Sequence, residues 1–213
     1  MKVNVELVSY ALVHDKEKIT TLNEKELIKK MILRRRFSRS SKILTYLASE
    51  CGFTTGCIVY GSAFGELGDS VAILEAIKNE ETVSPSAFQN SVYNTAVSYH
   101  SILETNKDEI YTLSSGDNTS YTVMQEGALA LQSKDEVFVC AIEAMNFEGV
   151  EVLNKCKDEL EYGIAFTIKK TDAKANVVVK DSSQLGVPNS LTWMKNLFDL
   201  CQDDTKNIIE IEL

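Results

Sequence analysis

A loop of small polar residues, Gly116 to Ser120, stands where an apolar stretch gives way to an amphipathic one. As a strand-to-helix junction it would present free backbone N–H groups, with Thr119 or Ser120 as a capping residue. In enzymes this geometry lowers the pKa of a nucleophile and stabilises an oxyanion. The loop contains no cysteine, and neither His14 nor His100 has a spacing that identifies it as activating a hydroxyl. Capping is therefore the expected role of Thr119 and Ser120.

Two further features lie at positions that carry chemistry in many α/β proteins. The segment Gly61 to Gly65 follows an apolar stretch but lacks the GxGxxG spacing and the lysine of phosphate-binding loops. Ser62 within it lacks the GxSxG pattern of a nucleophile elbow, so a tight turn is expected. Glu143 ends another apolar stretch, at the edge where parallel sheets usually bind ligands. A paired structural carboxylate is the expected outcome there.

The cysteines and histidines offer little chemistry. The five cysteines form no CxxC pair and no metal-ligand spacing, and with only two histidines neither a metal nor another cofactor is expected. Apolar neighbours and the odd count predict reduced, mostly buried thiols. His100, late in a predicted helix, is expected to be a surface or interface histidine. The cysteines are Cys51, Cys57, Cys140, Cys156 and Cys201.

Composition favours one globular domain over residues 1–213, with 44% apolar and 25% charged residues. No apolar run approaches the length of a transmembrane helix, and the N-terminal residues lack the pattern of a signal peptide. We therefore expect a cytoplasmic protein that does not associate with membranes.

The net charge of −9 argues against nucleic acid as a partner. The sequence contains one basic cluster in spite of this negative charge, formed by Arg34, Arg35, Arg36 and Arg39. The end of a helix and its following loop would explain it, because cations suit a helix C-terminus. The alternative is a contact with an acidic partner or with the phosphate of a carrier arm.

Hydrophobic periodicity predicts short apolar strands that alternate with amphipathic helices. Strands that are apolar on both faces and separated by helices indicate a parallel sheet covered on both sides, and hence an α/β fold. Strands are expected at 3–13, 56–60, 110–114, 136–141, a hairpin of 162–169 with 176–180, and 207–213. Helices are expected after residue 23, after residue 38 or 40, and at 70–78, 84–104, 119–132 and 188–201.

Three stretches resemble the N-terminal half of β-ketoacyl synthases: 59–66 (VYGSAFGE), 84–94 (SPSAFQNSVYN), and 127–131 (GALAL) leading into 136–143 (EVFVCAIE). The second is the most specific, and the resemblance covers about residues 3–180. The chain is most similar to the chain length factors of aryl polyene-type pigment pathways. The resemblance implies a thiolase-like half, with a mixed, mostly parallel five-stranded sheet and helices on both faces.

The chain departs from the catalytic members of that family at two positions. Where the family commonly has a histidine before the last asparagine of its motif, this chain has Tyr93. The nucleophilic cysteine of the family would fall near Asn118, Thr119 or Ser120, and none is present. The two catalytic histidines of the family come from a second half that this sequence does not contain. The resemblance therefore implies a subunit that does not catalyse condensation by itself.

Chain length factors act beside a full ketosynthase, so the resemblance implies a heterodimer or heterotetramer with a catalytic ketosynthase and indirect contact with an acyl carrier protein. In the family, the strand before the nucleophile junction pairs across the interface. Leu113→Pro should therefore abolish association, by removing a ladder donor. The apolar face of such a half must be covered by residues 188–213 or by a partner. The implied interface and acyl-channel residues are Phe88, Ser91, Val92, Tyr93, Ile110, Tyr111, Thr112, Leu113 and Ser114.

Two other functions stay open. One is a homodimeric thiolase-like protein that binds an acyl chain or an acyl carrier protein without condensing activity. The other is an acyl-transferring enzyme that uses Ser120 or Thr119. A covalent acyl adduct on the purified protein would favour the enzyme, and a stable self-dimer indifferent to any ketosynthase would favour the binding protein.

Overall fold

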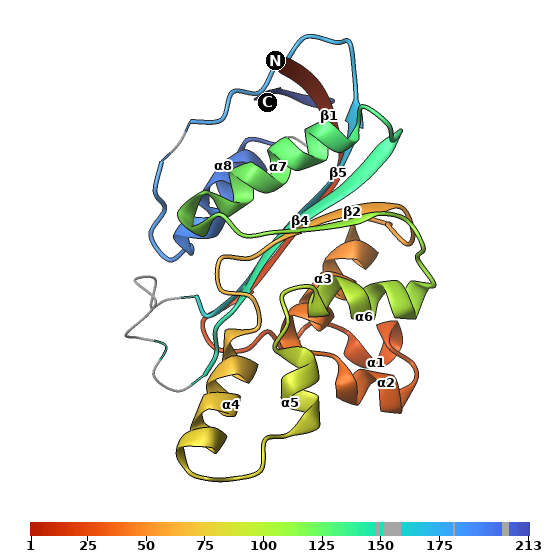
Figure 1. Cartoon of the computed structure of the whole chain (residues 1–213). Helices are drawn as coiled ribbons and strands as arrows, with labels where there is room; N and C mark the ends of the chain where they lie inside the picture. Colours follow the sequence, from red (N-terminus) through yellow and green to blue (C-terminus); the bar gives the residue numbers. More distant parts are fainter. Residues whose placement is uncertain (148–149, 151–158, 181, 202–204) are drawn as a thin grey trace.

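The computed structural model describes residues 1–147, 150, 159–180, 182–201 and 205–213. Its described part is built on one six-stranded sheet with the order β3-β2-β4-β5-β1-β6 (Figure 1). The strands are β1 (Lys2–Asp15), β2 (Cys57–Gly61), β3 (Ile110–Leu113), β4 (Glu136–Ala144), β5 (Glu161–Lys170) and β6 (Asn207–Glu212).

The sheet is mixed, as predicted, but it has six strands where five were expected. β2 pairs in parallel with β3 and β4, whereas β5 runs antiparallel to both β4 and β1. β3, β2, β4 and β1 therefore share one direction. The sixth strand is β6, which confirms the strand predicted at 207–213 and adds antiparallel to the outer side of β1. The predicted hairpin of 162–169 with 176–180 is wrong, because β5 is held between β4 and β1 and the later segment makes only the bridge Val177–Ile209.

Helices cover both faces of the sheet (Figure 1). α3 and α6 lie on one face and α7 and α8 on the other, and each pair contributes to an apolar core against the strands. No helix in the described ranges is both long and apolar enough to cross a membrane. The helices are α1 (Glu24–Leu27), α2 (Met31–Arg36), α3 (Arg39–Glu50), α4 (Leu67–Lys78), α5 (Pro85–Asn90), α6 (Thr95–Glu104), α7 (Thr119–Ala130) and α8 (Thr192–Leu200).

The C-terminal segment covers the sheet face that α7 leaves open. Leu191, Met194 and Leu197 are completely buried and belong to the same core as α7 and the central strands. Ile209 and Ile211 of β6 complete this core. Of the two ways expected to cover this face, the structure shows the first: the chain's own C-terminal elements pack on it.

The single helix predicted over 84–104 is wrong, because the chain breaks into α5 and α6. α5 begins as expected, with Ser84 accepting a hydrogen bond from the N–H of Ala87 and Pro85 in the first turn. It ends at Asn90, whose carbonyl accepts a 2.9 Å hydrogen bond from the hydroxyl of Thr95. Four residues separate the two helices, and they put Tyr93 at a position that it would not have in one continuous helix.

Candidate functional site

The predicted nucleophile position lies at the start of α7. The Thr119 hydroxyl donates a 2.7 Å hydrogen bond to the Gly116 carbonyl and accepts a 3.0 Å bond from the N–H of Ser115. Thr119 therefore holds the turn before α7. The predicted capping role is wrong, because the N-cap residue is Asn118 and no side chain accepts a hydrogen bond from the first turn of the helix. The Ser120 side chain is 1% exposed, and its hydroxyl has no hydrogen-bond partner among the described residues. Burial and the lack of a base both leave this hydroxyl poorly placed to act as a nucleophile.

Glu143, at the end of β4, closes the turn at Gly61 to Gly65. Its completely buried carboxylate accepts hydrogen bonds from the Ser62 hydroxyl at 2.8 Å and from the N–H of Ala63 at 2.6 Å. Burial raises the pKa of this carboxyl, and the hydrogen bonds partly oppose that rise. The predicted tight turn and the paired structural carboxylate are both confirmed, and they are parts of one structure.

Tyr93 ties the break between α5 and α6 to the same turn. Its hydroxyl lies 2.7 Å from the carbonyl oxygen of Ala63 and 3.0 Å from the hydroxyl of Ser114, just after β3. Its ring packs on Gly65, where an added Cβ would lie 3.0 Å from the ring and where φ is +59°. The structure thus brings together Tyr93 and Ser114, two residues predicted from different segments of the chain.

The predicted interface strand is the edge of the sheet. β3 pairs with β2 on one side and, within the described residues, has no partner strand on the other. Ile110 is 36% exposed, and Tyr111, Thr112 and Leu113 are half-buried. The row of unpaired backbone groups along this edge is suited to pairing with another chain.

The predicted acyl-channel residues lie on and just after α5. Phe88 is 69% exposed and Val92 is 49% exposed, which is unusual for apolar side chains of this size. Ser91 is half-buried, and its hydroxyl donates a 2.9 Å hydrogen bond to the carbonyl of Phe88. The described part of the chain therefore leaves Phe88 and Val92 available to a partner.

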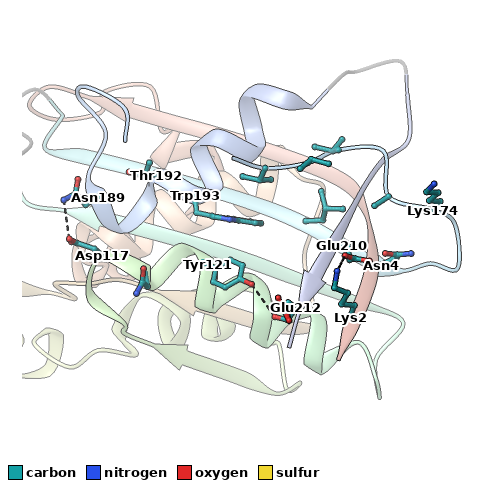
Figure 2. A pocket seen from close by; sticks show the side chains of 16 residues that line it. Lys2, Asn4, Asp117, Tyr121, Lys174, Asn189, Thr192, Trp193, Glu210 and Glu212 are labelled. Carbon is teal, nitrogen blue, oxygen red and sulfur yellow. Dashed lines mark hydrogen bonds and ion pairs between the residues drawn. The ribbon is translucent and has the colours of Figure 1, made fainter. Parts of the chain in front are cut away.

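A pocket of about 590 Å³ that the sequence did not predict lies between α7, α8 and β6 (Figure 2). Its walls include Tyr121 and Trp193, whose ring centroids are 5.2 Å apart. At one end the Asn189 amide donates a 3.4 Å hydrogen bond to the Asp117 carboxylate, and at the other an ion pair joins Lys2 to Glu210. The aromatic wall and the polar ends would suit an apolar group with a hydrogen-bonding end. Trp193 is the only tryptophan in the sequence, and it was the one feature of the sequence that could have pointed to this pocket.

The arginine cluster divides into two parts. Arg34, Arg35 and Arg36 form the last turn of α2, as expected for cations at a helix C-terminus. Arg39 instead begins α3. Its guanidinium donates hydrogen bonds to the buried carboxylate of Glu161 at 2.7 Å and to the carboxylate of Glu24 at 3.0 Å. Arg39 is thus a structural residue, whereas Arg35 and Arg36 are exposed.

The expectation that His100 lies at a surface or an interface is wrong. The side chain is 1% exposed, both ring nitrogens lack hydrogen-bond partners among the described residues, and burial lowers the pKa to about 4. The thiols of Cys57 and Cys140 are buried as predicted, and burial raises the pKa of Cys140 well above its ordinary value. Cys156 lies outside the described residues.

Comparison with known proteins identifies the fold. Residues 12–199 match a family model described as "Beta-ketoacyl synthase, N-terminal domain". Among solved structures, the fold is similar to the complex of a ketosynthase (ApeO) with its chain length factor (ApeC) from Xenorhabdus doucetiae. The TM-score is 0.63 with 18% identity, over 79% of this chain and 80% of the other.

Two further complexes have the same fold. The ishigamide ketosynthase/chain length factor gives a TM-score of 0.64 with 10% identity, over 80% of this chain and 63% of that one. AntDE:AntF, a type II acyl-carrier protein in complex with its ketosynthase, gives 0.62 with 12% identity, again over 80% and 63%. The aligned region thus spans less than two thirds of these two proteins. No curated protein sequence matches the chain. Because the family model covers most of its length, the chain belongs to the β-ketoacyl synthase N-terminal domain family.

Proposed function

We propose that this chain is a non-catalytic subunit, similar to a chain length factor, that pairs with a catalytic ketosynthase and shapes its acyl channel. The setting would be type II polyketide or fatty-acid-like synthesis of the aryl polyene kind. The assembly would be a heterodimer or heterotetramer, with an acyl carrier protein contacting it indirectly. Ketosynthase complexes with chain length factors among its structural neighbours support this proposal.

The observation that carries the proposal is the open edge of β3. The Leu113 carbonyl accepts from the N–H of Ser62, so the backbone of Leu113 faces β2. Because backbone groups alternate along a strand, the N–H and carbonyl of Ile110 and Thr112 face outward. These outward groups would form the ladder with a strand of the ketosynthase. Leu113→Pro, the substitution expected from sequence to test the edge, would instead break the internal ladder with β2.

Exposed apolar side chains near this edge support an acyl-channel role. Phe88 and Val92 project from the α5 region, which Tyr93 anchors to the end of β3 through Ser114. We propose that a partner paired along β3 also covers Phe88 and Val92. We propose that these two side chains, with Ser91, form part of the wall that limits the length of the growing acyl chain.

The non-catalytic part of the proposal depends on the start of α7. No cysteine occupies the junction, and Thr119 uses its hydroxyl to hold the preceding turn. Ser120 is buried, and His100 belongs to the opposite face of the sheet, packed beside Phe53. An acyl group would find neither an activated nucleophile nor a base here.

The test is co-expression with the ketosynthase encoded nearest to this chain, with only this chain tagged. We expect a one-to-one complex that survives size exclusion, and condensation that is lost when this chain is omitted. A stable self-dimer that ignores the ketosynthase would reject the proposal. It would favour the alternative, a homodimeric protein that binds an acyl chain or carrier, since β3 can also pair with β3 of a second copy about a two-fold axis.

A further inference from the structure

A second exposed apolar surface lies away from β3. A groove of about 980 Å³ runs between α2 and the C-terminal end of α6. Three large apolar side chains in it are exposed: Met31 by 52%, Ile32 by 71% and Ile102 by 64%. Apolar side chains gathered in one hollow indicate a surface that binds something. We call this surface the α2–α6 groove.

Cations surround the α2–α6 groove. Lys29, Lys30 and Arg36 line it, against a single carboxylate, Glu104. In the described chain none of these three cations has a salt-bridge partner, whereas the nearby Lys42 is paired with Glu24 at 2.8 Å. This basic rim stands out on a chain of net charge −9. The groove therefore favours an occupant that is both apolar and acidic.

The backbone around the groove limits the shape of the occupant. α2 and α6 form its sides, and neither helix offers the row of alternating backbone groups that a strand edge has. An extended strand would find no ladder to join, so strand addition is disfavoured. An amphipathic helix needs only side-chain contacts, with apolar anchors three or four residues apart, and so suits such a groove.

α4 of the same chain has the required chemistry. Not one of its residues is buried, and Leu74 and Ile77, three residues apart, are 65% and 60% exposed. Glu75 lies between them, and Glu80 and Glu81 follow the end of the helix, all three exposed. α4 is thus an exposed helix with two apolar anchors. Together with the residues that follow it, α4 carries three exposed glutamates against one exposed lysine, Lys78, and it lies beside α5 and apart from α2 (Figure 1).

We propose that α4 of one copy of this chain docks into the α2–α6 groove of a second copy. Leu74 and Ile77 would lie on Met31, Ile32 and Ile102, with the glutamates near the lysines and Arg36. Because the two surfaces differ, two copies can fill both grooves reciprocally about a two-fold axis and form a closed dimer. A contact made in one direction only leaves a free groove and a free helix, and extends into a larger ring or a filament. It uses neither β3 nor the α5 surface, so it stands independently of the proposed pairing with a ketosynthase.

Sedimentation of the full chain with reciprocal charge reversals tests this proposal. The groove variant is Lys30→Glu with Arg36→Glu, and the helix variant is Glu80→Lys with Glu81→Lys. We expect the average mass of the unaltered chain to rise above that of a monomer with concentration. Each variant alone should associate at least about tenfold more weakly. Mixing the two variants should restore assembly, since each now offers the charge that the other lacks.

Lys16→Glu with Lys107→Glu, at exposed positions outside the groove, is the control and should associate as the unaltered chain does. Circular dichroism checks that every variant is folded. An unaltered chain that stays monomeric would overturn the proposal. So would a mixture of the two variants that associates no better than either alone. Ketosynthase binding, measured separately by size exclusion, reports on the proposed function and not on this contact.

Discussion

The carboxylate of Glu143 accepts a 2.7 Å hydrogen bond from the hydroxyl of Ser190, which follows it by 47 residues in the chain. Glu143 also holds the turn after β2, through Ser62 and Ala63. One buried carboxylate therefore links the strand-to-helix turn of the family fold to the C-terminal segment that covers its apolar face.

Removing the Ser190 hydroxyl tests this link. Ser190→Ala leaves the buried Glu143 carboxylate with one donor fewer, and should lower the free energy of unfolding by about 1–3 kcal/mol. Urea denaturation measures the loss. Ser183→Ala, at an exposed serine, is the matched control and should change stability by less than about 0.5 kcal/mol. Equal effects at the two sites would contradict the role given to Ser190.

The close approach of α7 to β2 gives a second prediction. A Cβ at Gly61 would overlap the side chain of Val123 and lie 2.8 Å from that of Thr119. Gly61→Ala should therefore destabilise the chain by about 2 kcal/mol or more. The control is Gly68→Ala within α4, where the nearest atom would be 3.7 Å away. The control should be neutral or stabilising by up to about 1 kcal/mol, because alanine favours the helix. Thermal unfolding that ranks the two variants in the opposite order would contradict the packing.

Buried His100 makes stability depend on pH. Its pKa is about 4 in the folded chain and about 6.5 when unfolded, so between these values the unfolded chain binds the extra proton. Stability therefore falls as the pH drops from about 6.5 to about 4, by about 3 kcal/mol from this residue. His100→Leu should remove this part of the pH dependence. Relative to the unaltered chain, the variant should therefore gain about 3 kcal/mol of stability as the pH drops from about 6.5 to about 4, measured by urea unfolding at each pH. A difference between the two proteins that stays constant over this range would contradict the assignment.

Glu66 acts in the opposite sense and must be separated from His100. Burial raises its pKa to about 7, so the folded chain keeps a proton that the unfolded chain loses. Its contribution to stability is complete below about pH 4.5 and declines as the pH rises toward 7. Glu66→Gln should remove this decline. Identical pH profiles for Glu66→Gln and the unaltered chain would contradict the assignment.

The open edge of β3 gives a prediction about association. Thr112→Pro removes an outward N–H without touching the ladder to β2, and should abolish binding to the ketosynthase. Thr112→Val keeps the N–H and should bind normally, which makes it the matched control. Size exclusion of each variant with the ketosynthase, after circular dichroism has shown both to be folded, gives the comparison. Normal binding by the proline variant would exclude β3 as the paired edge.

Local patterns predicted most of the elements, because strands such as β2 and β4 are apolar on both faces and Ser84-Pro85 marks a helix start. The break after Asn90 was missed, because it depends on Tyr93 reaching Ala63 and Ser114, contacts that no local pattern records. The motif resemblance supplied the residues of β3 and α5 for which we propose an interface role. Pairings such as Glu143 with Ser190 and Tyr121 with Trp193 depend on where the C-terminal segment packs. The burial of His100 depends in the same way on tertiary packing.

We propose that this chain supports condensation without carrying the acyl group. The most direct measurement is the intact mass of each subunit after the purified complex is loaded with an activated acyl substrate. We expect an acyl adduct on the ketosynthase alone and no change in the mass of this chain. Condensation should depend on both chains. An adduct on this chain that is lost in Ser120→Ala or Thr119→Val would contradict it, and would show that the chain is itself an acyl-transferring enzyme.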